Sequence, residues 1–250
     1  MQSDIDRAHY QRLANKYDEN WAYSPEFMRW MTENLRKRLS LIPGSSRVLD
    51  VGSGTGLYAR GIAEQAGVVV CADLSAAMLE QLPADERLIP LVAGAEELAG
   101  GEIRLPHDSY DAILMKEVIH HVAHPPQVLD GMSRLLPPGG RILVAMLPSE
   151  IGYPLFDAAL ELFRERQPAP EDIADALGRA GLRTELTYDE FPLVFTLDRY
   201  TQMVRNRYMS MLASFDDNEI DAGISEIRRT HPGPEVRFPD RFAFVLGVKA

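Results

Sequence analysis

The sequence predicts an α/β fold, in which seven mostly parallel strands form one sheet with helices on both faces. Two observations predict this fold. From residue 47 onward, short apolar runs alternate with segments of helical spacing. The first two runs, residues 47–51 and 68–72, are almost wholly apolar, as in strands buried on both faces. A chain of 250 residues with 46% apolar content is large enough for one such domain.

The alternation gives an expected order of elements. We expect strands at residues 47–51, 68–72, 88–92, 110–116, 140–147, 182–190 and 240–249. We expect helices at 56–66, 75–82, 125–136, 155–166 and 171–180, with two more in 197–230. Strands that alternate with helices favour parallel pairing, because each helix carries the chain back to the start of the next strand.

The two ends of the chain differ from this regular middle. Residues 1–45 are expected to form an N-terminal helical cap, in which Ser24 caps a helix that begins at Pro25. Residues 46–250 are then the main domain. A helical lid at about 195–232 is expected before the last strand, over the ligand-binding end of the sheet.

Composition narrows the possible partners. Acidic residues outnumber basic ones 37 to 26, and the formal charge of −11 disfavours binding to nucleic acid. We expect no membrane segment, because no apolar run is long enough to span a bilayer. The single cysteine, Cys71, lies in an apolar strand and favours a reducing, cytoplasmic location. No zinc-like cysteine and histidine spacing is present, so no metal is expected.

A glycine-rich run follows the first expected strand. Asp50 ends the strand, and Gly52, Gly54 and Gly56 follow at alternate positions. This is the layout of a nucleoside site in a Rossmann-like, doubly wound sheet. A dinucleotide fingerprint needs a small residue where Leu57 stands. Asp50 also suits a positively charged ligand, such as an amino-acid ammonium group, better than a diphosphate.

The ordered motifs between residues 45 and 147 resemble those of class I S-adenosylmethionine-dependent methyltransferases. The motifs are Asp50–Gly56, Asp73-Leu74-Ser75, Gly94-Ala95-Glu96, the strand approach Ser109–Leu114 and the turn Arg134–Gly140. The resemblance implies S-adenosyl-L-methionine as the cofactor. It also implies a cofactor site made of Asp50, the three glycines, Asp73, Leu74, Ala95, Glu96 and Lys116.

The resemblance also implies individual roles. Asp73 would accept hydrogen bonds from both ribose hydroxyls, and Ala95 and Glu96 would contact the adenine. Lys116 would offer its backbone carbonyl to the ammonium group of the cofactor. The segment with Tyr10 and Tyr17 resembles one that closes over the cofactor in small-molecule members. Tyr17 would contact the methionine half, and Tyr10 would lie near the acceptor; both could instead anchor the helix to the core.

The acceptor is expected beyond the fourth strand, at residues 115–121, because open sheets bind ligands at the carboxyl ends of their strands. His121, or alternatively His120, could serve as a general base, and one of them could instead cap the next helix. Glu117 could line the pocket or be solvated. Arg205 and Tyr208 on the lid could bind an anionic acceptor. Alternatively, Arg205 is solvated and the lid packs on the core without binding the acceptor.

The sequence thus predicts methyl transfer to oxygen, nitrogen or carbon of a small molecule, and we expect the reaction to belong to secondary metabolism. One alternative is a cyclase or decarboxylase that uses S-adenosylmethionine as a positioned charge. A non-catalytic binding protein and a dehydrogenase are further alternatives. The acceptor and the oligomeric state cannot be read from the sequence.

Overall fold

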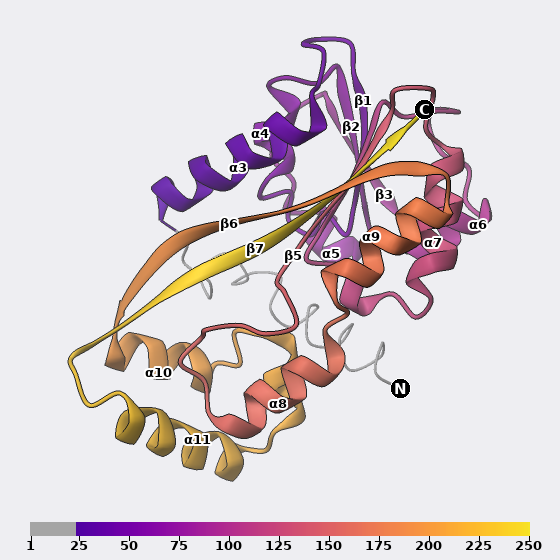
Figure 1. The fold of residues 1–250 in the computed structure, drawn as a ribbon. Coiled ribbons are helices and arrows are strands. Elements are labelled where there is room, and N and C mark those ends of the chain that lie inside the picture. The colour runs from indigo at the N-terminus through magenta and orange to yellow at the C-terminus, as the bar shows by residue number, and fades with distance from the viewer. Residues whose placement is uncertain (1–23) are drawn as a thin grey trace.

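A seven-stranded sheet runs through residues 24–250, the part of the chain that the structure, a computed structural model, describes (Figure 1). The strand order is β3-β2-β1-β4-β5-β7-β6, and β7 alone among these strands runs in the opposite direction to the other six. The strands are β1 (Arg47–Val51), β2 (Val68–Asp73), β3 (Leu88–Val92), β4 (Ala112–Lys116), β5 (Arg141–Met146), β6 (Leu182–Thr196) and β7 (Glu235–Lys249). The expected mostly parallel, seven-stranded sheet is confirmed.

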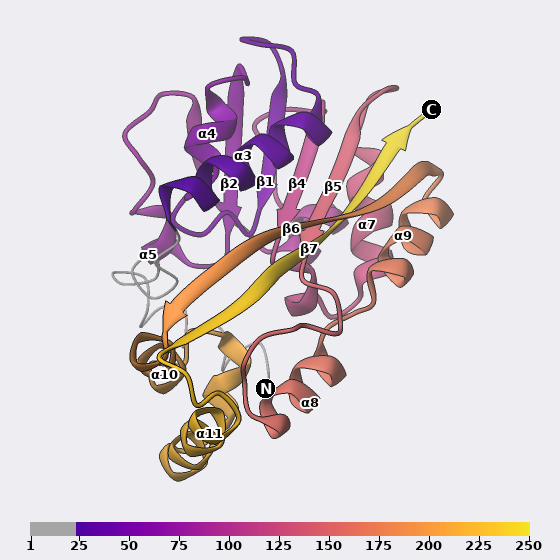
Figure 2. The same cartoon turned by 60° about the vertical axis from the view of Figure 1, so that its left-hand side comes forward.

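Helices cover both faces of this sheet and build two separate apolar cores (Figures 1 and 2). One core contains buried residues of α3 (Pro25–Leu39), α4 (Ala59–Ala63) and α5 (Ala76–Leu79). The other contains buried residues of α6 (Ala95–Gly100), α7 (Pro125–Arg134) and α9 (Pro170–Arg179). This arrangement confirms the predicted helices on both faces.

The first described helix follows the sequence signals closely. The Oγ of Ser24 accepts a hydrogen bond from the backbone N–H of Phe27 at 3.2 Å, and Pro25 occupies the first helical position. The helix buries Phe27, Met31, Leu35 and Leu39 against the sheet. The expectations for Tyr10 and Tyr17 lie outside the described residues.

Three helices extend the first core past the carboxyl ends of the parallel strands (Figure 2). They are α8 (Asp157–Arg166), which follows β5, and α10 (Leu197–Arg205) and α11 (Asp217–Thr230), which both lie between β6 and β7. A short 3₁₀ turn, Ser210–Ser214, joins the last two. The expected helical segment before the last strand is therefore present, and its role as a lid stays a prediction.

The last two strands are longer than predicted. Expected at residues 182–190 and 240–249, they span 182–196 and 235–249. Pro192 and Pro239 lie just outside the expected strands, and the structure pairs them directly opposite each other. Proline is tolerated there because β7 pairs with β5 only from Ala243 onward, which leaves a two-stranded ribbon beyond it.

Two helices are shorter than predicted. The helix expected at 56–66 covers only Ala59–Ala63, and the one expected at 75–82 covers Ala76–Leu79. In the first case Gly56 has a φ of +75°, a left-handed conformation that belongs to a turn and not to a helix. No helix within residues 24–250 combines the length and apolarity needed to cross a membrane.

We expect the packing of α7 on α6 to tolerate no side chain at Gly131. A Cβ atom there would lie 2.5 Å from the carbonyl oxygen of Ala99, which belongs to the backbone of α6. Gly131→Ala should lower the free energy of unfolding by about 1–3 kcal/mol. Gly178→Ala is the matched control, because a Cβ on this helical glycine meets no atom within 4 Å. It should raise stability by about 0.5–1 kcal/mol. Urea unfolding would measure both, and equal effects would contradict the packing argument.

Candidate cofactor and acceptor site

The glycine turn after β1 is held against the end of β2 by backbone hydrogen bonds. The N–H groups of Gly52 and Ser53 both donate to the carbonyl oxygen of Ala72, at 2.8 and 3.0 Å. Gly52 has a φ of +71°, and a Cβ there would lie 2.5 Å from Cγ2 of Val118. A residue with a side chain would therefore clash with the loop that follows β4. Around Gly54, by contrast, a Cβ would meet no atom of the described residues within 4 Å.

Asp73 ties the ends of β1 and β2 together. Its Oδ2 accepts a hydrogen bond from the N–H of Gly54 at 2.9 Å, and its Oδ1 accepts one from the N–H of Ser75 at 2.8 Å. Burial raises the pKa of this carboxyl, whereas the two N–H groups and the nearby His121 oppose the rise. Each carboxylate oxygen still has room for a second donor. Both oxygens could thus accept hydrogen bonds from a diol.

Asp50 lies at the end of β1 and is only 4% exposed. Burial raises its pKa to about 7, Asp73 contributes to the rise, and Lys116 opposes it. A buried carboxyl with a raised pKa is stabilised in its ionised form when a cation is placed beside it. The charge of a bound ammonium group would favour the ionised form of Asp50.

The turn after β3 contacts the loop that follows β4, at the same edge of the sheet. Gly94 caps α6, and its N–H donates to Oε2 of Glu97 at 2.8 Å. Ala95 is buried, and Oε1 of Glu96 accepts a hydrogen bond from the N–H of Ala123 at 3.0 Å. The side chain of Glu96 thus bridges to the loop that follows His121. Leu74 is 49% exposed and packs beside Gly94.

The segment after β4 carries the acceptor residues predicted from the sequence. Glu117 has a φ of +54°, and its Oε1 accepts a hydrogen bond from the N–H of Leu147 at 2.8 Å. Burial raises the pKa of Glu117, while Lys116 and His121 oppose the rise. Glu117 thereby fastens the end of β4 to the end of β5.

The two histidines form a short 3₁₀ turn, Ile119–His121, with ring centroids 4.1 Å apart. Burial holds the pKa of His120 well below its usual range, and Nδ1 of His120 has no hydrogen-bond partner among the described residues. His121 acts electrostatically on both Asp73 and Glu117. The structure therefore brings His121, and not the ring of His120, toward the carboxylates of the site.

The two predicted residues of the helical segment have partners within it. Arg205 forms an ion pair with Asp221 of α11 at 2.7 Å, and its side chain is 52% exposed. Tyr208 is buried, and its hydroxyl lies 3.0 Å from that of Tyr200. The Arg205 contact joins α10 to α11 at the surface, so this arginine has a structural role that needs no acceptor.

Sequence analysis missed Asp240 and Tyr153. The hydroxyl of Tyr153 donates to Oδ1 of the fully buried Asp240 at 2.5 Å, while Oδ2 has no hydrogen-bond partner among the described residues. Burial raises the pKa of Asp240 to about 7. One sequence signal could have found this acid. Asp240 interrupts an alternating apolar pattern whose other members are Val236, Phe238, Phe242 and Phe244.

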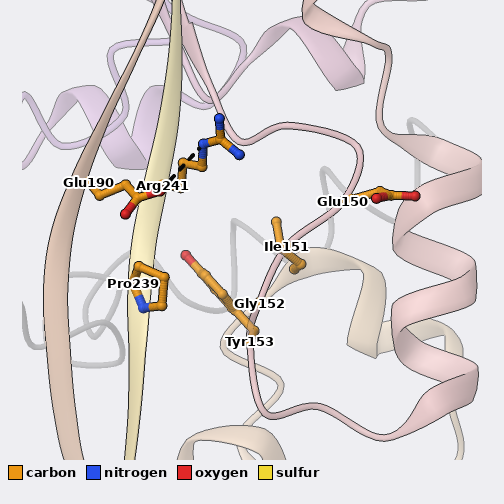
Figure 3. Close-up of a pocket in the computed structure, with 7 residues that line it drawn as sticks. All are labelled: Glu150, Ile151, Gly152, Tyr153, Glu190, Pro239 and Arg241. Atoms are coloured by element: carbon orange, nitrogen blue, oxygen red, sulfur yellow. Dashed lines mark ion pairs between the residues drawn. The ribbon is translucent and has the colours of Figure 1, made fainter.

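A pocket lies between the segment that carries Tyr153 and the β6–β7 ribbon (Figure 3). Its lining residues are Glu150, Ile151, Gly152, Tyr153, Glu190, Pro239 and Arg241. An ion pair of 3.5 Å between Glu190 and Arg241 spans the two strands at its wall. Tyr153 therefore contributes both to this pocket and to the buried contact with Asp240.

We expect Asp240 to make stability depend on pH. Its pKa rises from 3.8 to about 7 on folding, so the folded state holds a proton that the unfolded state has lost in this range. The free energy of unfolding should therefore fall as pH rises from 4 to about 7, by up to about 4 kcal/mol. Asp240→Asn keeps an acceptor for Tyr153 and removes the ionisation. It should be the more stable protein at pH 8 and show a flatter pH dependence in urea unfolding.

The control for this experiment is Asp175→Asn, at an exposed position on α9. It should follow the pH profile of the unchanged protein. Parallel profiles for Asp240→Asn and the unchanged protein would contradict the assignment.

Comparison with known proteins gives a consistent family. Residues 49–144 match the family model described as "Methyltransferase domain". The chain is 30% identical over 168 residues to the ubiquinone/menaquinone biosynthesis C-methyltransferase UbiE of Methylococcus capsulatus, covering 63% of this chain and 65% of that protein. It is 34% identical over 118 residues to a ubiquinone biosynthesis O-methyltransferase of Xylella fastidiosa, covering 45% and 46%. The chain thus spans less than two thirds of the length of either relative.

Solved structures share the fold at low sequence identity. A putative methyltransferase from an antibiotic biosynthesis pathway of Anabaena variabilis has a TM-score of 0.67 at 16% identity, covering 87% of this chain and 96% of that one. Phosphoethanolamine N-methyltransferase 2 of Haemonchus contortus, in complex with S-adenosyl-L-methionine, has a TM-score of 0.61 at 20% identity, covering 98% and 60%. These likenesses show the fold alone. Residues 49–144 are thus a methyltransferase domain, and the chain has the fold of the class I S-adenosylmethionine-dependent methyltransferases.

Proposed function

We propose that this protein transfers the methyl group of S-adenosyl-L-methionine to a small-molecule acceptor. The observation that carries the proposal is the geometry of Asp73. Its carboxylate is fixed by two backbone N–H groups beside a glycine turn where, at Gly54, a Cβ would meet no atom of residues 24–250 within 4 Å. A half-buried carboxylate held in this way is suited to bind the two hydroxyls of a ribose.

The residues around Asp73 fit the remaining parts of this cofactor. Asp50 lies where an ammonium group would favour its ionised form, and the backbone carbonyl of Lys116 lies at the end of the neighbouring strand. Ala95 and Glu96 begin the helix after β3 and would contact the adenine. When bound, the cofactor supplies an electrophilic methyl group on a sulfonium.

The acceptor would lie over the ends of β4 and β5. The curated relatives are named as C- and O-methyltransferases of quinone biosynthesis, which supports a small organic acceptor. The apolar core that extends past the sheet, with buried Met203, Met209 and Met211, supports the same class. Glu117 and Tyr208 remain candidates for contact with the acceptor.

We assign His121 the role of general base. It lies near Asp73 and Glu117, and it belongs to the loop after β4, at the carboxyl edge of the sheet. A neutral imidazole there can accept the proton of an acceptor hydroxyl as the new bond to the methyl carbon forms. The remaining rate enhancement comes from holding the acceptor atom, the methyl carbon and the sulfur in line.

A reaction without methyl transfer is the second candidate. The [4+2]-cyclase SpnF shares the fold with a TM-score of 0.57 at 18% identity. Such likeness shows only that this sheet is compatible with cyclase chemistry. Release of S-adenosylhomocysteine from labelled cofactor in the presence of candidate acceptors separates the two. Methyl transfer requires this release, and a cyclase leaves the cofactor intact.

Asp73→Asn should weaken binding of S-adenosylhomocysteine by about 10-fold to 100-fold. The substitution removes the charge and places an amide N–H₂ against one of the two backbone donors, and a charge-assisted hydrogen bond contributes about 1.5–3 kcal/mol. Isothermal titration calorimetry would measure the change. Asp130→Asn is the control, because Asp130 forms a surface ion pair with Arg134 on α7. Equal affinity in the two variants would refute the ribose role of Asp73.

His121→Ala should lower kcat by about 100-fold or more if His121 is the base, because general base catalysis contributes about 10²–10⁴ in rate. The affinity for S-adenosylhomocysteine should stay the same. His124→Ala, at an exposed position three residues later, should leave both unchanged. Steady-state kinetics at saturating acceptor would measure the effect. Full turnover in His121→Ala would exclude the base.

A further inference from the structure

The loop that carries the two histidines is held at both ends by glutamates. This histidine loop, residues 117–123, follows β4 directly, and it turns through a hydrogen bond of 2.9 Å from the N–H of His121 to the carbonyl oxygen of Val118. At its far end the N–H of Ala123 donates to Oε1 of Glu96. Its first residue is a second glutamate, which bonds to the end of the neighbouring strand β5. The backbone between the two glutamates therefore has a defined path.

Glu117, the first residue of the loop, has a backbone conformation that favours glycine. Its φ of +54° lies in the left-handed region, which few residues with a side chain adopt. Its N–H donates to the carbonyl oxygen of Ala145 at 2.8 Å, and its Oε1 accepts a hydrogen bond from the N–H of Leu147 at 2.8 Å. A strained residue persists where the surrounding contacts determine its conformation. Here the side chain makes one of these contacts, and glycine could not make it.

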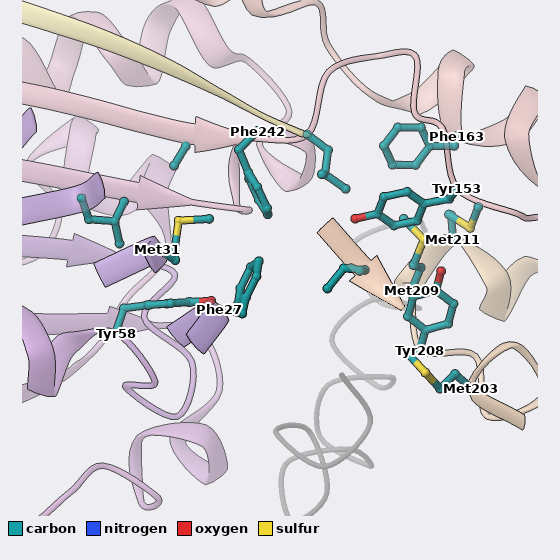
Figure 4. Packing of buried hydrophobic residues seen from close by; sticks show 14 of the residues in the cluster. Phe27, Met31, Tyr58, Tyr153, Phe163, Met203, Tyr208, Met209, Met211 and Phe242 are labelled. Carbon is teal, nitrogen blue, oxygen red and sulfur yellow. The ribbon is translucent and has the colours of Figure 1, made fainter. Parts of the chain in front are cut away.

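The partner of this glutamate is itself fixed. Leu147 is 1% exposed, and its carbonyl oxygen accepts a hydrogen bond from Nε2 of Gln167 at 2.7 Å. Gln167 is buried and follows α8 directly, where its N–H donates to the carbonyl oxygen of Phe163 at 2.9 Å. Figure 4 shows Phe163 near Tyr153, among the buried side chains of the first core. The N–H that the glutamate accepts therefore belongs to a residue whose carbonyl group is held as well.

We propose that Glu117 is the positioning residue of the histidine loop: its side chain fixes the turn from which the loop starts, and thereby the place of His121. The proposal rests on the proposed function, in which His121 is the general base, and it gives Glu117 a role that needs no contact with the acceptor. A base transfers a proton only within hydrogen-bond reach, about 2.6–3.2 Å. A misplacement of about 1 Å can lower the rate about 100-fold, so a shift at the start of the loop would lower turnover.

Another glutamate makes the same contact without a loop to position. Oε1 of Glu226, on α11, accepts a hydrogen bond of 2.8 Å from the N–H of Asp157, the first residue of α8. Glu117 differs from Glu226 in two ways, because it has a left-handed backbone and because His121 acts on it electrostatically. Glu226 is therefore a matched control for the loss of a bond between a glutamate and a backbone N–H.

Amide hydrogen exchange, followed by NMR in the protein saturated with S-adenosylhomocysteine, measures the hold on the loop without turnover. Glu117→Met removes the acceptor of the Leu147 N–H. It should lower the protection factor of the His121 N–H by about 10-fold or more, the cost of leaving a buried backbone donor unpaired. Glu117→Gln keeps a carbonyl oxygen at that place and should retain most of the protection. Val144, within β5, should keep its protection in both variants, because the sheet stays folded.

Two further variants complete the exchange experiment. Glu117→Gly removes the side chain and suits the left-handed backbone, so it remains informative if Glu117→Met fails to fold. It should lower the protection of His121 as Glu117→Met does, whereas Glu226→Met should leave that protection unchanged. Unchanged protection of His121 in Glu117→Gly, an equal loss at Val144 and His121, or the same loss in Glu226→Met would each overturn the proposal.

Steady-state kinetics connect the loop to turnover. Glu117→Met should lower kcat by about 10-fold to 100-fold with unchanged affinity for S-adenosylhomocysteine, and Glu117→Gln should restore most of kcat. A kcat that stays the same in Glu117→Met but falls in His121→Ala would overturn the proposal. Full turnover in His121→Ala would instead refute the proposed base, and the exchange data would still decide the role of Glu117 in the loop.

Discussion

The hydrogen bond from the Gly54 N–H to Asp73 is the contact on which the rest of the site depends. It can form only because β1 and β2 are parallel neighbours, so that the turn after one strand meets the last residue of the other. The same parallel arrangement brings β4 beside β1 and presses Val118 against Gly52. Glycine is required there, since any side chain would push apart the two loops that enclose the site.

This edge of the sheet concentrates buried charge. Asp50, Asp73 and Lys116 lie in the last two residues of their strands, and Glu117 follows β4 directly. Beyond these ends, backbone N–H groups donate to the side chains of Asp73 and Glu117. Burial penalises each charge, and the pKa values of the three acids are raised accordingly. Such a site is less stable when empty than when a ligand with complementary charge fills it. The left-handed backbone of Glu117 is a further strained feature of this edge. The surrounding contacts hold the residue in this conformation.

The β6–β7 ribbon supports the part of the fold that lies beyond the carboxyl edge of the sheet. It continues beyond the last contact with β5 and positions α10 and α11 past the carboxyl edge. Asp240 lies on this ribbon and meets Tyr153, which comes from the segment before α8. The pair anchors the ribbon to the loop after β5, and the helical segment belongs to the same apolar core as one face of the sheet.

The sequence by itself determined the local features of this protein. Strand burial, the cap at Ser24 and the spacing of the glycines depend on residues close together in the chain, and these were predicted correctly. The order of elements then implied the parallel sheet and the edge where ligands bind. Tertiary structure alone decided the length of the ribbon, because the pairing of residues 191–196 with 235–240 joins segments that lie far apart in the sequence. It also decided that Tyr153 meets Asp240 and that Arg205 meets Asp221. Contacts of this kind depend on strand register and helix packing, which the sequence near either residue does not encode.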